Sequence, residues 1–221
     1  MRFYYTKLFI IILFTIQMTD SIIKMQSLFK GYSFRKRILI PPSSYQTKLW
    51  RQNQKWYRGG KHNECELYQR DLIEKITKLR CNKSDKRFNI YNKLLIDNKY
   101  PMKHKDGFEW TEDFDGHIVY DDKTNNRIIN YFFNLKIICD AGGAQTRSLR
   151  EVYHFISVQL EHCILFPDDS IYFVNILDGN TCYKHMDKFN YLLNKPQYCF
   201  VRHRIFVGDM NSFQEFWLKK K

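Results

Sequence analysis

The chain has 221 residues, of which 44% are hydrophobic and 17% are aromatic. This composition excludes an intrinsically disordered chain and is sufficient for one compact domain with its own core. The formal net charge of +13 predicts a polyanionic partner, either nucleic acid or an acidic membrane surface. An AT-rich genome would also enrich Lys and Asn, but the aromatic residues interleaved with the basic ones favour nucleic-acid binding.

The cysteines are scattered without a Cys-x-x-Cys pair or a Cys/His cluster at zinc spacing, which excludes a zinc finger. Cys139 and Cys163 fall within apolar strand or helix patterns, so we expect them to be buried thiols. Buried thiols of this kind indicate a reducing compartment. The expected location is therefore intracellular, in the cytoplasm or nucleus.

Residues 1–24 form an apolar extension that contains the run LFIIILFTI, residues 8–16. This run is shorter than the roughly 20 apolar residues that span a bilayer, so no stable membrane insertion is expected. No small-x-small cleavage site follows it, as a signal peptide requires. Three interpretations stay open: an upstream start, which we favour, a weak secretory signal, or a membrane-surface anchor. Secretion follows only if the segment is a real signal.

Residues 25–62 form a basic, aromatic arm ahead of the main domain. Trp50 lies among Arg51, Lys55 and Arg58 in the sequence KLWRQNQKWYR. Cations that neutralise phosphates beside rings that stack or wedge are typical of a nucleic-acid surface, so these four residues are candidate DNA contacts. The alternative is a solvated arm whose tryptophans pack on the core.

Residues 63–221 show the pattern of the folded domain. Helical spacing of apolar residues predicts helices over 64–80, 88–97, 148–160 and 186–193. Continuous or alternating apolar runs predict strands over 114–120, 128–139, 171–177 and 204–207. Strands that alternate with helices in this order predict an α/β fold with a mixed β-sheet flanked by helices.

The first two long strands form a predicted hairpin whose turn contains DDKTNN. If this turn is centred at Lys123–Thr124, Asp113 lies opposite Asn134 and Asp115 lies opposite Phe132. Since side chains alternate between faces, Asp113, Asp115, Asn134 and Lys136 then share one face. These groups would form a hard-oxygen site for a divalent cation beside an ammonium group. A shift of the hairpin register by one residue would move Asp113 and Asp115 off this face. The alternative interpretation of Lys136 is an ordinary lysine at the edge of a sheet.

The order Asp115-Gly116, hairpin, Asn134-x-Lys136 and then NLKIICDAGGAQTRSLREVYHFI resembles the core of the PD-(D/E)xK nucleases, in particular type II restriction endonucleases. The resemblance covers residues 108–210 and implies a restriction-endonuclease-like core. It implies cleavage of double-stranded DNA at a short specific sequence, with Mg²⁺ or substitute Mn²⁺ as cofactor and a homodimer as the assembly. Asp115, Lys136 and Asn134 would be catalytic, and Asp115, Asp113 and Asn134 would hold the metal. The chain departs from the family pattern at Asn134, where a second acid is usual. The helix before the hairpin makes Glu66 a further possible ligand.

The turn GGAQTR joins the second hairpin strand to the next helix. Its glycines let the backbone approach a ligand closely, and the following helix N-terminus can receive a phosphate. In the resemblance this segment lies near the cleaved backbone, which makes Gly142, Gly143, Gln145, Thr146 and Arg147 candidate DNA contacts. A tight turn that requires a positive φ at glycine is compatible with the same sequence.

Two other functions are consistent with the sequence. The chain could be a catalytically inactive DNA-binding protein that keeps the nuclease fold but has lost cutting through Asn134. It could instead be a basic secreted or membrane-surface protein, in which case residues 1–24 would be functional.

Overall fold

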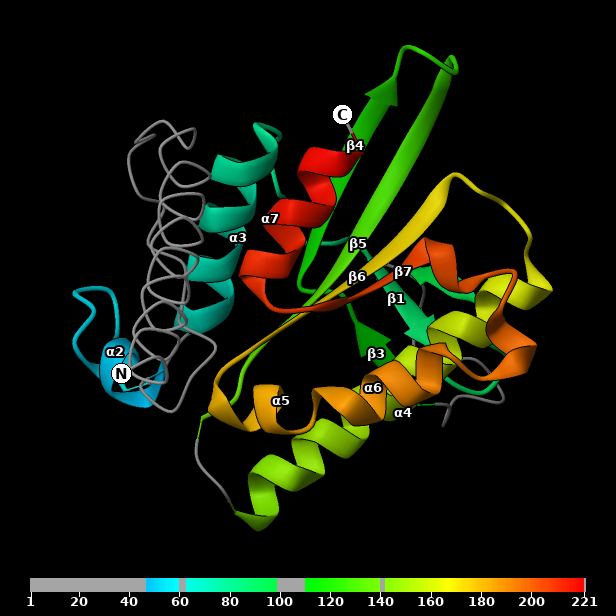
Figure 1. Ribbon diagram of the computed structural model, residues 1–221. Helices are drawn as coiled ribbons and strands as arrows, with labels where there is room; N and C mark the ends of the chain where they lie inside the picture. The colour runs from blue at the N-terminus through cyan, green and yellow to red at the C-terminus, as the bar shows by residue number, and fades with distance from the viewer. Residues whose placement is uncertain (1–46, 60–62, 99–109, 140–141, 221) are drawn as a thin grey trace, which may run out of the picture. The chain divides into compact units, whose positions relative to one another are not determined.

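A computed structural model describes residues 47–59, 63–98, 110–139 and 142–220, which all belong to the compact unit Leu39–Lys221. Predictions for residues 1–24 and for residues 25–46 of the basic arm lie outside the described residues. The described chain is an α/β structure (Figure 1). In this part of the chain, no helix is both long enough and apolar enough to cross a membrane.

The main sheet contains strands in the order β4-β5-β6-β7. Its strands are β4 (Gly116–Asp122), β5 (Arg127–Ile137), β6 (Ile171–Asp178) and β7 (Ile205–Gly208). β4 and β5 form an antiparallel hairpin, whereas β5 pairs in parallel with β6 and β6 in parallel with β7. The predicted mixed sheet is therefore confirmed. The strands expected over 171–177 and 204–207 correspond to β6 and β7.

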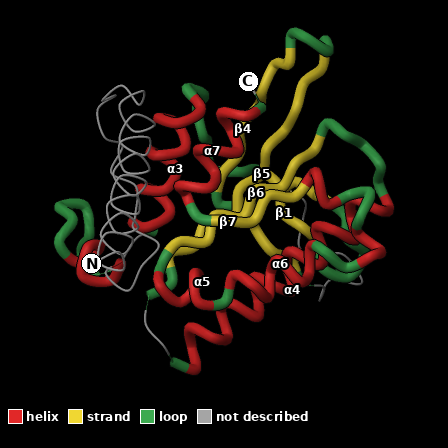
Figure 2. Tube along the Cα trace, in the orientation of Figure 1, coloured by secondary structure: helices red, strands yellow, loops and turns green. Residues whose placement is uncertain are grey.

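Helices cover both faces of this sheet (Figures 1 and 2). On one face lie α4 (Gly143–Leu165), α5 (Asn180–Lys184) and α6 (Met186–Leu193), and on the other lie α3 (Glu64–Thr77) and α7 (Met210–Lys219). α4 makes the parallel crossover from β5 to β6. The segment from α5 through the short helices η1 (Pro196–Tyr198) and η2 (Arg202–Arg204) makes the crossover from β6 to β7.

Apolar side chains fill the space between the sheet and each helix layer. On the α4 face, Ile156 and Leu160 join Phe173 of β6 and Phe189 of α6 in one buried cluster. On the opposite face, α7 packs Phe213 against Phe133 of β5 and Trp217 against Tyr131 of β5, with ring centroids 5.7 and 5.2 Å apart. β5 is thus fixed on both faces, as a strand that carries a site must be.

A second, smaller sheet corrects the prediction of a helix over residues 88–97. It has the order β2-β1-β3, formed by β1 (Lys86–Asn89), β2 (Leu95–Asp97) and β3 (Thr111–Asp113). The side chain of Asn89 accepts hydrogen bonds from the backbone N–H groups of Tyr91 and Asn92, and Lys93 has a φ of 61°. This side chain-to-backbone bonding stabilises a hairpin turn instead of a helical turn.

Several helix boundaries also differ from the predictions. α3 ends at Thr77 because Lys78 adopts the left-handed conformation, with φ 64°. Asn63 precedes α3 but makes no side-chain capping hydrogen bond. α4 begins at Gly143, ahead of the predicted residue 148, and the backbone of Gly142 is extended at φ −175°, so no positive φ is needed there.

Within the described residues, three α-helices were not predicted, namely α2 (Thr47–Gln52), α5 and α7, nor were the short helices η1 and η2. The start of α7 has a clear signal in the sequence, because the Asp209 carboxylate accepts a hydrogen bond from the Ser212 N–H as an N-cap. The expectation for two cysteines is confirmed, since Cys139 and Cys163 are buried and belong to no disulfide.

Candidate active site at the open edge of β5

The candidate site lies where β5 continues beyond its hairpin partner. The β4–β5 ladder ends at the pair Gly116–Phe133, and β3 pairs with β1 instead of β5. β5 nevertheless continues to Ile137, held in parallel by β6 on its other side. Among the described residues, the segment from Asn134 to Ile137 therefore has no strand paired along this edge, where a ligand can approach the backbone.

The hairpin register differs from the expected one. Asp115 was predicted opposite Phe132, but Phe132 pairs with His117, two residues further along. The physical reason is the turn: the Asp122 carboxylate accepts hydrogen bonds from the backbone N–H and the side-chain amide of Asn125, which centres the turn one residue later. A shift of two residues keeps each side chain on its predicted face. Asp115 consequently lies next to the Asn134–Lys136 segment.

Asp115 and Lys136 are brought together at this edge. Asp115 Oδ2 accepts a hydrogen bond of 2.7 Å from the Leu135 backbone N–H and lies 3.4 Å from Lys136 Nζ. The Leu135 N–H points to the side where a further strand would pair, so the carboxylate supplies the missing acceptor. Asp115 thus has a structural role at the strand edge and forms an ion pair with the lysine of the predicted site.

Asp113 does not join the hairpin face as predicted. It belongs to β3 of the smaller sheet, and its carboxylate lies 3.2 Å from Arg87 Nε. Phe114, which separates it from Asp115, is buried and packs against Phe132, Phe155 and Phe173. The chain therefore changes sheets around Phe114. The pattern Asp-Phe-Asp reads as one continuous strand in the sequence, which is why Asp113 was assigned to the hairpin.

Asn134 lies in a buried network of amide groups. Its Nδ2 donates to Asn175 Oδ1 at 3.1 Å, and Asn175 exchanges hydrogen bonds with Gln159 of α4 at 2.8 and 3.2 Å. Because Nδ2 is engaged and amide nitrogens do not bind hard cations, Asn134 can offer only its oxygen to a metal. This network fixes the rotamer of Asn134 beside Lys136.

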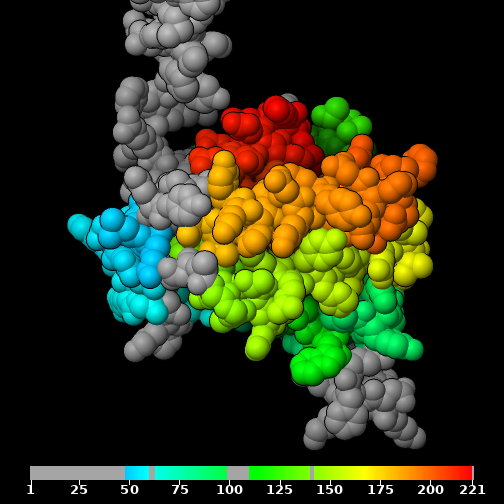
Figure 3. Space-filling view, turned by 60° about the horizontal axis from the view of Figure 1, so that its bottom comes forward, coloured from blue at the N-terminus to red at the C-terminus, as the bar shows by residue number. Residues whose placement is uncertain are grey.

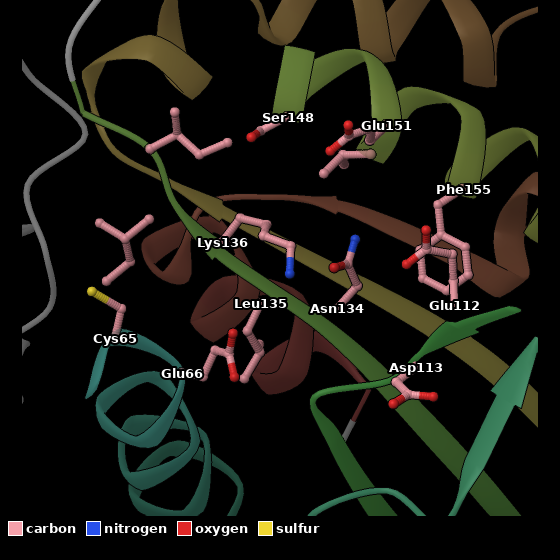
Figure 4. Close-up of a pocket in the computed structure, with 13 residues that line it drawn as sticks. Cys65, Glu66, Glu112, Asp113, Asn134, Leu135, Lys136, Ser148, Glu151 and Phe155 are labelled. Atoms are coloured by element: carbon pink, nitrogen blue, oxygen red, sulfur yellow. The ribbon is translucent and has the colours of Figure 1, made fainter. Parts of the chain in front are cut away.

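Asn134 and Lys136 open into a pocket of about 420 Å³. Figure 4 shows Ser148 and Glu151 of α4 on one side of them and Glu66 of α3 on the other. Glu112 and Asp113 of β3 also line the pocket. A chain with a net charge of +13 thus surrounds this lysine with carboxylates.

The carboxylates of the pocket influence one another electrostatically. Burial raises the pKa of Glu66, the negative charge of Asp115 raises it further, and Lys136 opposes both effects. Burial likewise raises the pKa of Glu112, which Lys136 lowers and Glu151 raises. Among the described residues that line the pocket, four are acidic (Glu66, Glu112, Asp113 and Glu151) and one is basic (Lys136), a lining that would accommodate an additional cation.

A metal cage made of protein side chains is absent from residues 47–59, 63–98, 110–139 and 142–220: no three His, Cys, Asp or Glu side chains there are placed to hold an ion together. Mg²⁺, however, is usually held by one or two carboxylates together with waters and substrate phosphates. Asp115 and Glu66 fit that reduced set. The Asn134 oxygen would add a neutral ligand.

Another buried acid, Asp178, lies on the opposite face of the sheet. It ends β6, next to Ile137 of β5, and its oxygens accept hydrogen bonds from Gln69 Nε2 at 2.7 Å and from the Met210 N–H at 3.0 Å. Burial raises the pKa of Asp178 from its ordinary 3.8 to about 7. Asp178 connects α3, β6 and α7 and does not line the pocket.

The predicted DNA contacts after β5 lie on the first turn of α4. Gly142, Gly143, Thr146 and Arg147 are exposed, and Gln145 is partly exposed. The next turn contributes Ser148 and Glu151 to the pocket, so the exposed N-terminal turn of α4 lies next to it.

The predicted contacts of the arm separate into two groups. Lys55 and Arg58 are exposed, whereas Trp50 is half-buried against Tyr68 of α3, with ring centroids 5.7 Å apart. Arg51 Nη1 donates to the Ile137 carbonyl of β5 at 3.4 Å. The alternative of tryptophan packing therefore describes Trp50, and this part of the arm contacts the α/β domain.

Sequence reasoning missed Glu112 and Glu151 as pocket residues. Glu151 sits beside Arg150 on α4, which suggested a surface pair, and Glu112 lies on a strand that was not predicted. The signal that was available for Glu151 is a carboxylate on the helix that follows the lysine strand, one turn after Arg147.

Comparison with protein-family models, with curated proteins and with solved structures found no match to this chain.

Proposed function

We propose that the chain is a metal-dependent endonuclease of the restriction type, with a core of the PD-(D/E)xK kind, that hydrolyses phosphodiester bonds of double-stranded DNA. The observation that carries the proposal is the ion pair of Asp115 with Lys136, whose Oδ2 and Nζ atoms lie 3.4 Å apart at the open edge of β5. The charges of both residues influence the pKa of Glu66. The element order α3, β4–β5 hairpin, α4, β6 supports the nuclease-like topology.

The residues in and beside the pocket have separable tasks in this reaction. Mg²⁺, or Mn²⁺ in its place, would supply Lewis-acid stabilisation and a more acidic bound water. Asp115 and Glu66 would hold the cation, and Asn134 would contribute its amide oxygen. Lys136 orients the attacking water and stabilises the negative charge that develops on the phosphate oxygens. The exposed N-terminal turn of α4, with Thr146 and Arg147, contacts the neighbouring phosphate of the substrate.

Cleavage of both strands at a short specific sequence requires two copies of this site. Two-fold symmetric assembly is the usual solution for a symmetric substrate, so the proposed enzyme acts as a homodimer. A reduced interior with buried thiols is consistent with an intracellular enzyme.

A second candidate function is DNA binding without cleavage. The observation that favours it is Asn134, which is neutral where the family has an acid and whose amide nitrogen is engaged by Asn175. A chain that kept the nuclease fold for binding alone would have this arrangement.

Incubation of the full chain with supercoiled plasmid, in Mg²⁺, in Mn²⁺ and in chelator, distinguishes the two candidates. Discrete fragments that require the metal support the nuclease, and the fragment ends give the recognised sequence. DNA binding without cuts in either metal contradicts the nuclease and supports the binding protein. Lys136→Ala, purified in the same way, serves as the control for contaminating nuclease activity, since any cutting that persists at the wild-type rate would not come from the proposed site.

A further inference from the structure

The α5–α6 segment has an amphipathic pattern that the proposed site does not use. Cys182, Phe189 and Leu192 are buried against the sheet. The residues that follow one another along this segment and are not buried include Lys184 at the end of α5, Lys188 and Tyr191 of α6, and Lys195 just beyond α6. We call these last four residues the α5–α6 stripe.

The stripe is basic and aromatic on its outer side. Lys184 and Lys188 are exposed, Tyr191 is 69% exposed, and Lys195 Nζ lies 5.7 Å from the centre of the Tyr191 ring. Residues 180–202 contain only one acid, Asp187. Burial together with the positive charges of Lys188 and Lys184 lowers the pKa of His185, so the local potential is positive.

The same segment of the chain carries further exposed aromatic and basic residues. Tyr183 is 66% exposed and Phe200 is 86% exposed, and Arg202 is exposed as well. The combination of aromatic residues with lysines fits nucleic acid, because the lysine ammonium group and the tyrosine hydroxyl group both donate hydrogen bonds to phosphate oxygens.

The stripe begins beside the pocket. α5 starts immediately after β6, and the Thr181 N–H donates to the carbonyl of Ile138, a residue that lines the pocket, at 3.2 Å. Gly179 makes this junction possible: its φ is +105°, and a Cβ there would lie 2.3 Å from the Ile138 carbonyl oxygen. α5–α6 and α4 then lie side by side on one face of the molecule (Figure 3).

We propose that the α5–α6 stripe is a track for the phosphate backbone of double-stranded DNA, leading from the pocket across the α4 face of the protein. Lys184 ends α5, Lys188 lies in α6 and Lys195 follows α6, so the segment presents three successive lysines that can each contact a phosphate. The direction of this track rests on the proposed function of the pocket. Binding along it can be measured without any cleavage.

The test is the salt dependence of DNA binding by the full chain in chelator, measured by fluorescence anisotropy on a labelled duplex. The variant Lys184→Gln/Lys188→Gln/Lys195→Gln removes the cations of the stripe. The matched control Lys75→Gln/Lys78→Gln/Lys219→Gln removes the same charge from α3 and α7 on the other face, where these lysines are also exposed. Circular dichroism melting of both variants checks that they fold as the wild type does.

The stripe variant is expected to reduce the slope of log K against log salt by about 3, because each lost phosphate contact contributes about 0.9. The control is expected to retain the wild-type slope. Equal slopes for the two variants, or no DNA binding by the wild type, would overturn the proposal. Loss of binding to vesicles containing phosphatidylserine, with the DNA slope unchanged, would overturn it in favour of a membrane surface.

The two proposals fail separately in this experiment and the plasmid assay. A chain that cuts DNA but whose stripe variant binds like the control overturns the track and leaves the nuclease. A chain that binds through the stripe and cuts nothing in either metal overturns the nuclease and leaves the track.

Discussion

The Asp115 carboxylate accepts a hydrogen bond of 2.7 Å from the Leu135 backbone N–H, at the point where β5 has lost its hairpin partner. The same oxygen lies 3.4 Å from Lys136 Nζ. One side chain therefore stabilises the strand edge and forms part of the proposed active site, so the two roles must be separated by the choice of substitution.

Asp115→Asn is expected to separate them. The amide oxygen still accepts the Leu135 N–H, so stability should change little, whereas the lost charge should reduce cleavage by at least about 100-fold, as for other groups that act on developing charge. Asp115→Ala removes the acceptor as well and should lower the free energy of unfolding by about 1–3 kcal/mol. Urea unfolding and single-turnover cleavage check both variants. Equal stability of the two variants would contradict the structural role.

Lys136→Ala is expected to reduce cleavage strongly and to retain DNA binding. Loss of a group that stabilises developing negative charge typically costs about 10²–10³-fold, so the rate constant should fall by about that factor. Single-turnover cleavage and anisotropy on the same duplex give the two quantities, with Lys75→Ala as control. A Lys136→Ala variant that cuts at the wild-type rate would exclude this lysine from the reaction.

Asn134→Asp tests the neutral position in the pocket. Replacing the Nδ2 donor by oxygen removes the hydrogen bond to Asn175 Oδ1 and places two acceptors together, so without metal the variant should lose about 1–3 kcal/mol of stability. With Mg²⁺ the added carboxylate gains a counter-charge, and the melting temperature should rise more for the variant than for the wild type. Thermal melts with and without Mg²⁺ measure this. An identical Mg²⁺ shift in both proteins would contradict a cation beside Asn134.

Asp178 predicts a pH dependence of stability. Its folded pKa of about 7 lies above the ordinary 3.8, so between these values the folded state binds more protons than the unfolded state. Stability should therefore fall as pH rises from about 4 to about 7, by at most about 1.4 kcal/mol per pH unit from this group. Urea unfolding of the wild type and of Asp178→Asn across this range isolates the effect. A wild-type slope equal to that of Asp178→Asn would show that Asp178 ionises normally.

The sequence predicted the α/β class, the long strands and the face on which Asp115, Asn134 and Lys136 lie. It succeeded there because alternation with a period of two survives a register shift of two residues. It did not predict the exact register, since the side-chain bonding of Asp122 with Asn125 decides where the turn is centred. The short sheet was missed because Ile90, Leu94 and Leu95 fit a helical pattern as well as a hairpin.

The acidic pocket was beyond sequence reasoning for another reason. Glu66, Glu112 and Glu151 come from α3, β3 and α4, and each has an adequate local explanation as a helix-start acid, a strand residue or a surface ion pair. Only the tertiary arrangement places them around Lys136.

Phe114 gives the core an influence on the chemistry. Its ring is held among Phe88, Phe132, Phe155 and Phe173, and it directly precedes Asp115 in the chain. A substitution that shifts the Phe114 ring also shifts the Asp115 carboxylate. Misplacement of a reacting group by about 1 Å can reduce a rate by about 100-fold. An apolar residue without reactive atoms thereby helps to position Asp115 in the proposed active site, and substitutions in that aromatic cluster should lower both the stability of the fold and the rate of the proposed reaction.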